Sequence, residues 1–99
     1  MTLKEACDTL HVDMGANDDI ISGLLEAIPG YIETTTGLKE EDQGKEPLVD
    51  VVSGFLLTQW YYADRADDLS LTRTASSLLK VISLKARNYE QMEKLMQGL

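Results

Sequence analysis

Cysteine, histidine and proline are scarce in this 99-residue sequence, which contains one cysteine, one histidine and two prolines. A single cysteine, Cys7, excludes an internal disulfide and every metal or redox motif that needs two cysteines. We predict that Cys7 is a small buried apolar residue, with an intermolecular disulfide as the alternative. There is no apolar run of about 18 residues that could span a membrane, and residues 1–10 lack the pattern of a signal peptide. We therefore expect a soluble protein that is made in a cytoplasm and has no membrane partner.

Few residues are available for catalysis or metal binding. Cys7 and His11 are four residues apart and could supply part of a metal site, but a structural zinc needs four ligands. The oxygen-bearing residues Asp13, Asn17 and Asp19 do not fit the calcium-binding loop of an EF-hand. No glycine-rich phosphate loop is present. We therefore expect a protein that is not an enzyme and has no cofactor; a small metal-dependent enzyme is the weakest alternative.

The charge is acidic and unevenly distributed. Seventeen acids and nine bases give a net charge of −8. Residues 1–50 carry twelve acids and three lysines, a net −9, whereas residues 51–99 carry five acids and six bases, a net +1. Because lysine and arginine are not clustered along the sequence, nucleic-acid binding is not expected as the main function. The asymmetry favours head-to-tail attraction between copies; a solvated acidic surface is an equal alternative.

Apolar residues make up 43% of the sequence, which is ordinary for a globular domain. Ninety-nine residues can form one core but not two. We therefore predict a single all-α domain over residues 1–99, a small bundle of about four helices with a central apolar third helix. Thr2 and Glu5 have the spacing of a capping box, which predicts that the first helix begins there. One face of this helix carries Leu3, Ala6, Cys7 and Leu10.

The second helix is predicted to begin at Asn17 or Asp18, since short polar side chains cap helices and acids favour the positive helix end. Pro29 removes one backbone hydrogen bond, so a kink is expected near Leu25–Pro29. Gly37 stands where a left-handed residue would end the helix. Eight residues form the apolar stripe: Ile20, Ile21, Leu24, Leu25, Ile28, Tyr31, Ile32 and Thr35.

Residues 38–46 are polar and acidic, and we predict that they form an exposed loop. Pro47 suits the first position of a third helix, where its missing amide proton costs nothing. This helix is expected to end near Arg65 and, because it is apolar on several sides, to lie at the centre of the bundle. Its main apolar face comprises Leu48, Val51, Val52, Phe55, Leu56 and Trp60.

A loop over residues 67–72 is predicted to lead into the last helix. That helix is either one long helix or two pieces broken near Asn88. Met92 and Met96 roughly continue its apolar stripe, and residues 90–99 are predicted to be a tail that is flexible or ordered by a partner. The stripe itself comprises Ala75, Leu78, Leu79, Ile82, Ala86 and Tyr89.

Two groups of side chains are candidates for contact with another subunit or partner. Trp60, Tyr61 and Tyr62 must point in three directions on a helix, so Trp60 is predicted to pack inside. Tyr61 or Tyr62 then faces a partner, because aromatic side chains with a polar tip suit interfaces; a half-buried surface tyrosine is the alternative. Met92 and Met96 either cover the core or dock a partner.

Several motifs occur in an order that resembles a known family. MTLKEA at residues 1–6 is followed by LHVD at 10–13, NDDIISGLLEA at 17–27, YIETTTG at 31–37 and WYYADR at 60–65. Together they resemble the head-to-tail connector (adaptor, or head-completion) proteins of long-tailed phages and related prophages over roughly residues 1–90. The chain departs from the family pattern at Pro29 and in residues 89–99, which extend past the usual end of the family.

The resemblance implies a subunit of a homo-oligomeric ring of about a dozen copies. Such a ring docks beneath the portal protein, receives the next head-completion or tail protein, and lets DNA pass through its channel without sequence-specific binding. The implied location is the head–tail junction of the virion, after assembly in the host cytoplasm. Acidic side chains in the channel would repel DNA phosphates, and Asp67 and Asp68, in the loop before the last helix, are the candidate channel-facing residues.

A second hypothesis belongs to a different class of protein. A small prophage-encoded or host-encoded helical module for protein–protein interaction would have the same composition. Such a module would usually be monomeric or dimeric, whereas a connector forms rings. The oligomeric state therefore separates the two hypotheses.

Overall fold

The structure, a computed structural model, describes the backbone of residues 1–63 and 69–98 and the side chains of residues 1–63 and 73–98. This part of the chain contains α-helices and no strand, which confirms the predicted all-α class. Five helices occur within it, one more than expected, because a short helix forms in the segment predicted to be a loop. They are α1 (Leu3–Leu10), α2 (Asp18–Thr36), α3 (Glu40–Gln43), α4 (Pro47–Tyr61) and α5 (Leu69–Gln97).

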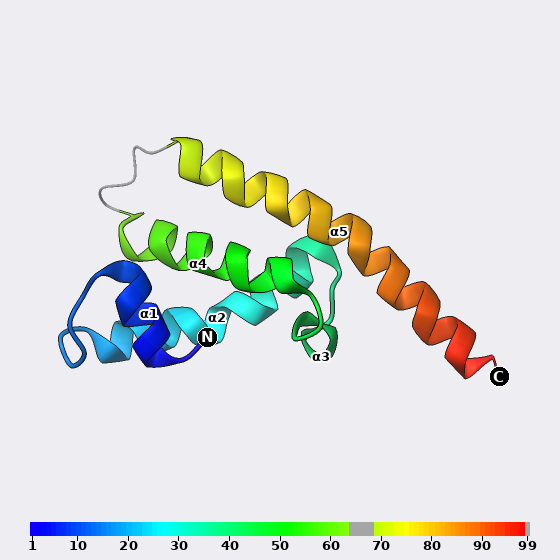
Figure 1. Cartoon of the computed structure of the whole chain (residues 1–99), viewed down its shortest axis with the longest axis horizontal. Coiled ribbons are helices and arrows are strands. Elements are labelled where there is room, and N and C mark those ends of the chain that lie inside the picture. The colour runs from blue at the N-terminus through cyan, green and yellow to red at the C-terminus, as the bar shows by residue number, and fades with distance from the viewer. Residues whose placement is uncertain (64–68, 99) are drawn as a thin grey trace.

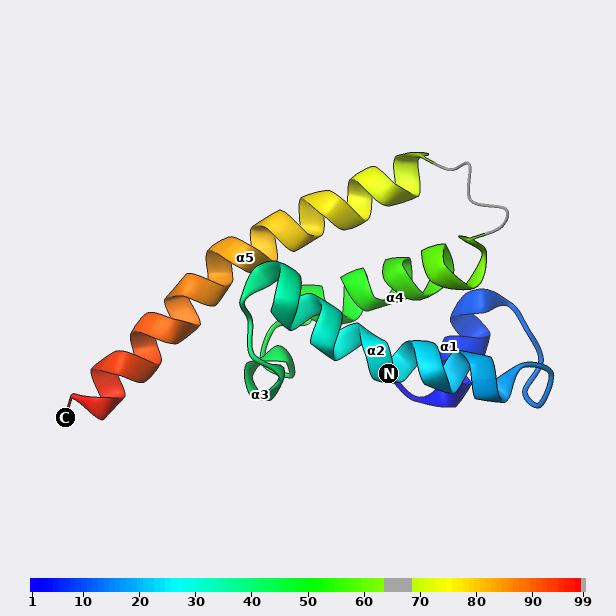
Figure 2. The same ribbon diagram turned by 180° about the vertical axis from the view of Figure 1, so that it is seen from behind.

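Helix α4 is the centre of the molecule. It packs against α1, α2 and α5, which confirms the central apolar helix predicted from the sequence. Helix α5 runs along α4 and then continues past α3, so that the C-terminus lies far from the rest of the chain (Figures 1 and 2). The extents of 51 × 28 × 18 Å and a radius of gyration of 15.0 Å reflect this elongated shape, since a compact chain of this length would have a radius of about 13 Å.

Local signals set the ends of α1. The Thr2 hydroxyl accepts a hydrogen bond from the Glu5 amide at 3.2 Å, and the Glu5 carboxylate accepts one from the Thr2 amide at 3.3 Å, so the predicted capping box is confirmed. These bonds to Thr2 lower the pKa of the Glu5 carboxyl. The helix ends at His11, whose left-handed backbone has a φ of 59°.

Helix α2 is continuous through Pro29, and its ribbon changes direction along its length (Figure 2). Asn17 occupies the predicted N-cap position, but its side-chain oxygen accepts no capping hydrogen bond, while its Nδ2 donates a hydrogen bond to the Tyr61 hydroxyl. At the other end, Gly37 is left-handed with a φ of 81° and donates its amide hydrogen to the Glu33 carbonyl. The predicted C-terminal cap is therefore confirmed.

The prediction of an exposed loop over residues 38–46 is correct only in part, because residues 39–41, 44 and 45 are exposed but residues 40–43 form α3 and three side chains are buried. Leu38 is 1% exposed and Glu46 is 5% exposed, and α3 lies between them. The buried amide of Gln43 donates hydrogen bonds to the carbonyl oxygens of Pro29, at 2.9 Å, and Leu38, at 3.1 Å. The segment is thus fixed to α2 by bonds that its polar composition does not reveal.

The termini of α4 and α5 differ in part from the predictions. Pro47 occupies the first turn of α4 as predicted, but the helix ends at Tyr61 and not near Arg65. Helix α5 begins at Leu69, so residues 69–72 are helical and not a loop, and it continues without a break at Asn88 to Gln97. Residues 90–97, expected to belong to a tail, are therefore part of this helix.

The core is shared by the four longer helices and Leu38. Cys7 is 1% exposed, as predicted for a small apolar residue, and burial, followed by the nearby charges of Asp18 and Asp8, raises the pKa of its thiol. The prediction that Val51 belongs to the main apolar face of α4 is wrong, since this side chain is 48% exposed. The buried apolar residues are Ala6, Cys7, Leu10, Ile21, Ile28, Ile32, Leu38, Val49, Val52, Leu56, Leu57, Ala75, Ile82 and Ala86.

Candidate subunit interface

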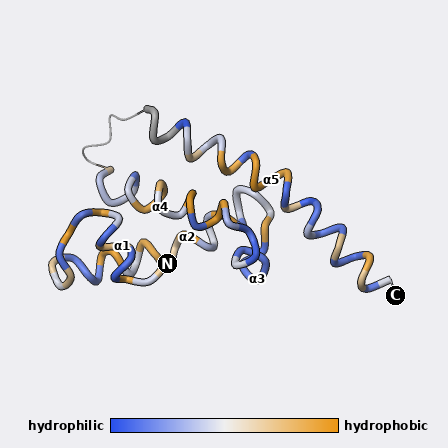
Figure 3. The backbone as a smooth tube through the Cα atoms, viewed as in Figure 1, coloured by the Kyte–Doolittle hydropathy of each residue, from blue (hydrophilic) through white to orange (hydrophobic). Residues whose placement is uncertain are grey.

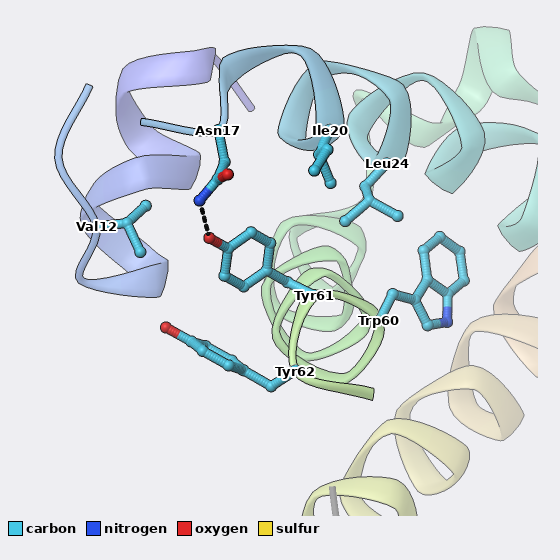
Figure 4. A pocket seen from close by; sticks show the side chains of 7 residues that line it. All are labelled: Val12, Asn17, Ile20, Leu24, Trp60, Tyr61 and Tyr62. Atoms are coloured by element: carbon cyan, nitrogen blue, oxygen red, sulfur yellow. Dashed lines mark hydrogen bonds between the residues drawn. The ribbon is translucent and has the colours of Figure 1, made fainter. Parts of the chain in front are cut away.

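The three consecutive aromatic side chains at the end of α4 point in different directions, as predicted (Figure 4). The Tyr61 hydroxyl accepts a hydrogen bond of 2.7 Å from Nδ2 of Asn17. The Tyr62 hydroxyl donates one of 2.7 Å to the carbonyl oxygen of Leu10. Both tyrosines are half-buried, and their rings meet edge to face at 4.8 Å. Their hydroxyls therefore attach the end of α4 to α1 and to the start of α2.

Trp60 points away from Tyr62, on the opposite side of the end of α4 (Figure 4). It is half-buried rather than fully inside, and its ring meets the edge of Tyr31 at 5.1 Å. A groove of about 490 Å³ runs along this aromatic group, and Ile20, which is 60% exposed, forms part of its wall. The groove is lined by Val12, Asn17, Ile20, Leu24, Trp60, Tyr61 and Tyr62.

The C-terminal part of α5, residues 85–97, is called distal α5, and it exposes large apolar side chains. Met92, Leu95 and Met96 are 61%, 71% and 74% exposed. The two methionines were expected roughly to continue the core stripe, and they do not, because α5 has by then left the body (Figure 1). An apolar side chain gains nothing from this exposure in an isolated chain. Figure 3 shows hydrophobic and hydrophilic residues alternating along this stretch.

Polar contacts hold one side of distal α5. Nζ of Lys39 lies 3.2 Å from the Glu93 carboxylate, which raises the pKa of Lys39. The Tyr89 hydroxyl lies 3.3 Å from the Glu46 carboxylate, which also pairs with Lys85 at 3.2 Å. A second groove, of about 420 Å³, separates α3 from α5 and is lined by Glu41, Asp42, Lys45, Tyr89, Met92, Glu93 and Met96.

The predicted interface residues do not form a single site. Tyr61 and Tyr62 lie near the start of α2, whereas Met92 and Met96 lie on distal α5, at the other end of the molecule. The candidate channel residues at positions 67 and 68 lie outside the described residues. The predictions also missed exposed apolar residues of α5, Val81, Leu84 and Leu95. Their spacing of three and eleven residues places them on one helix face, and that spacing is the signal that could have found them.

Cys7 and His11 do not share a site, since Cys7 is buried and His11 is exposed at the end of α1. The Asp18 carboxylate accepts a hydrogen bond of 2.8 Å from the Gly15 amide, which stabilises the turn before α2. In the described part of the chain, no three histidine, cysteine or acidic side chains converge as metal ligands would. Of the described helices, none is long and apolar enough to cross a membrane.

The described residues thus form an elongated helical domain with an aromatic groove at one end and an exposed apolar helix at the other. No protein-family model, curated protein or solved structure matches this chain. The geometry of the chain and the order of its sequence motifs are therefore the basis for a functional proposal.

Proposed function

We propose that this chain is the subunit of a phage head-to-tail connector ring. The ring docks under the portal protein, joins the capsid to the next head-completion or tail protein, and leaves a central channel through which DNA passes. The subunit acts by assembly and catalyses no reaction. Its place is the head–tail junction of the virion, after assembly in the cytoplasm of the host.

The observation that carries the proposal is the exposed distal part of α5. Three large apolar side chains there, Met92, Leu95 and Met96, are more than half exposed. Each buried aliphatic side chain of this size contributes about 1.5–3 kcal/mol, so covering them by another subunit would supply much of the free energy of assembly. A helix that leaves its own body is suited to reach a neighbour in a ring.

Two properties of the sequence support the same proposal. The motifs between residues 1 and 65 follow the order found in the connector family. The charge distribution, net −9 over residues 1–50 and net +1 over residues 51–99, favours attraction between unlike parts of neighbouring copies. An overall acidic ring would also repel the DNA that passes through it.

The test is the oligomeric state of the purified chain. Multi-angle light scattering over a range of concentrations, with negative-stain images of the largest species, should reveal rings of about a dozen copies. If the chain alone stays small, it is added to the portal of the phage or prophage that encodes it, where rings should form on the portal face. Failure to form rings alone and on the portal would contradict the connector proposal.

The alternative is a helical interaction module encoded by a prophage or its host. The aromatic groove lined by Trp60 and Tyr61 favours this function, because half-buried aromatic side chains with polar tips are common in protein interfaces. Light scattering separates the two proposals, since a stable dimer without larger species would favour the module.

A further inference from the structure

Helix α5 carries a row of basic side chains. Arg73, Lys80, Arg87 and Lys94 follow one another at intervals of seven residues, and all four are exposed. Seven residues make almost two turns of an α-helix, so these side chains lie along one face at intervals of about 10 Å. Bases that are dispersed in the sequence therefore form a continuous row in the folded chain.

An exposed apolar row lies beside the basic row. Val81, Leu84, Met92 and Leu95 are between 41% and 71% exposed. Two of them directly follow a base of the row, Val81 after Lys80 and Leu95 after Lys94. This surface is distinct from the buried face of α5 that carries Ile82 and Ala86, so α5 has a second apolar face that the core does not use.

Helix α2 has the same pattern with the opposite charge. Asp19, Glu26 and Glu33 are also seven residues apart, and all three are exposed. Ile20, which directly follows Asp19, is 60% exposed, and Tyr31 on the same face is 40% exposed. In the described part of the chain, Asp19 and Glu26 of the acidic row form no salt bridge. The same is true of Lys80 and Arg87 in the basic row of α5.

From these two matching surfaces we infer that α5 of one copy packs antiparallel on α2 of a second copy. Val81 and Leu95 follow a base by one residue and Ile20 follows an acid by one residue. On both helices the charged row therefore lies on the same side of the apolar row when the helix is viewed from its N-terminus. Two such helices bring their charged rows to the same edge only if they run in opposite directions. One register pairs all three acids with bases: Asp19 with Lys94, Glu26 with Arg87, and Glu33 with Lys80.

The charge distribution favours a second copy of this chain as the partner, with α5 of one copy on α2 of the other. Residues 1–36, which include α1 and α2, contain seven acids and one base, a net −6, whereas residues 69–97 contain five bases and two acids, a net +3. Packing α5 on another α5 would place like charges together, which is unfavourable. Nucleic acid is a poorer partner, because the whole chain has a net charge of −8 and phosphates would leave the apolar row uncovered.

This contact rests on the proposed function and deepens it, since it names the surfaces that join neighbouring subunits. The two surfaces are different, so the contact is heterologous. Each copy presents one exposed face of α2 and one exposed face of α5. Contacts of this kind propagate until a ring closes. The proposed order is therefore α5 on α2 around the whole ring.

Charge exchange tests the contact directly. One variant carries Lys80→Glu and Arg87→Glu, another carries Asp19→Lys and Glu26→Lys, and a third carries all four substitutions. Each of the first two should need at least about tenfold higher concentration to assemble, because like charges then face each other. Mixing these two, or using the third alone, should restore assembly at the wild-type concentration, measured by light scattering.

Two control variants have the same changes in net charge at exposed positions outside both rows and both grooves: Lys4→Glu with Met14→Glu and Ala16→Glu, and Asp13→Lys with Asp50→Lys. They should assemble like the wild type.

If the charge-reversed variants assemble normally while the wild type forms rings, the contact is wrong and the connector proposal survives. A chain that stays monomeric up to about 1 mM also overturns the contact. In that case the connector proposal is tested separately, by ring formation on a portal. Loss of binding to duplex DNA in the Lys80→Glu, Arg87→Glu variant, with unchanged assembly, would assign the basic row to DNA and overturn the contact.

Discussion

Polar side chains connect both ends of α4 to the rest of the molecule. At its C-terminal end, Tyr61 accepts a hydrogen bond from Asn17. At its N-terminal end, the buried Glu46 carboxylate binds Lys85 and Tyr89 of α5. A polar group that is buried without a partner costs about 1–3 kcal/mol, so the partners at these two ends specify which helix ends meet.

The Tyr61 hydroxyl gives the first prediction. Tyr61→Phe leaves the half-buried amide of Asn17 without its acceptor, so the free energy of unfolding in urea should fall by about 1 kcal/mol. Tyr31→Phe is the matched control, because the Tyr31 hydroxyl forms no hydrogen bond to any described residue and the side chain is 40% exposed. Equal losses in the two variants would mean that the hydrogen bond contributes nothing.

Tyr89 gives a prediction about pH. Burial raises the pKa of its hydroxyl above the usual 10.0, and the neighbouring Glu46 carboxylate raises it further. The folded chain therefore favours the protonated phenol, and this stabilisation is fully present below about pH 10 and is lost as the pH rises through the folded pKa. Between about pH 9 and pH 11 the free energy of unfolding should fall more steeply in the wild type than in Tyr89→Phe. Parallel slopes in urea titrations would contradict this assignment.

At the scale of the single helix, α2 contains two glycines with opposite expected effects. Gly37 needs its left-handed backbone, with a φ of 81°, so Gly37→Ala should lower the free energy of unfolding by about 1 kcal/mol. Gly30 lies inside the helix, and an added Cβ would meet nothing within 4 Å. Gly30→Ala should therefore stabilise the chain by about 0.5–1 kcal/mol. Urea denaturation of both variants checks the sign of each effect.

Helix ends were predictable where the signal is local. Thr2 and Glu5 form a capping box, Gly37 ends α2 and Pro47 begins α4, each because of residues within a few positions along the chain. Residues 69–72 were predicted to be part of a loop over residues 67–72. They are helical because extending an existing helix adds one backbone hydrogen bond per residue.

Features that depend on distant residues were not predictable from composition. Leu38 is buried and Gln43 binds the Pro29 carbonyl only because the chain returns to α2, so two side chains of a mainly polar segment are buried. The predicted interface residues Met92 and Met96 are exposed, and so are Leu95 and Val81, which the sequence prediction did not name. A helix can have a second apolar face, so the spacing of apolar residues alone does not show which of them are buried in the core.

At the scale of the whole molecule, the proposed assembly uses a surface that the core does not. Leu95 is 71% exposed, so Leu95→Glu should change the free energy of unfolding by no more than about 0.5 kcal/mol. The same change places a charge in the exposed apolar row of α5 and should suppress the largest species in light scattering. Gln97→Glu, an exposed substitution of equal charge on the same helix, is the control and should leave assembly unchanged. An unfolded Leu95→Glu variant would show that distal α5 belongs to the core after all.

Salt separates the two forces that would hold the assembly together. The Debye length falls from about 10 Å at 0.1 M to about 3 Å at 1 M, so attraction between the basic row of α5 and the acidic row of α2 should weaken over this range. Sulfate strengthens apolar burial, so sodium chloride is the salt to use. Light scattering at a fixed protein concentration should then show the mass of the largest species decreasing with salt. The variant with all four charges exchanged should follow the same curve, since its rows are still opposite in sign. A mass that stays constant or rises would mean that apolar contacts alone join the subunits.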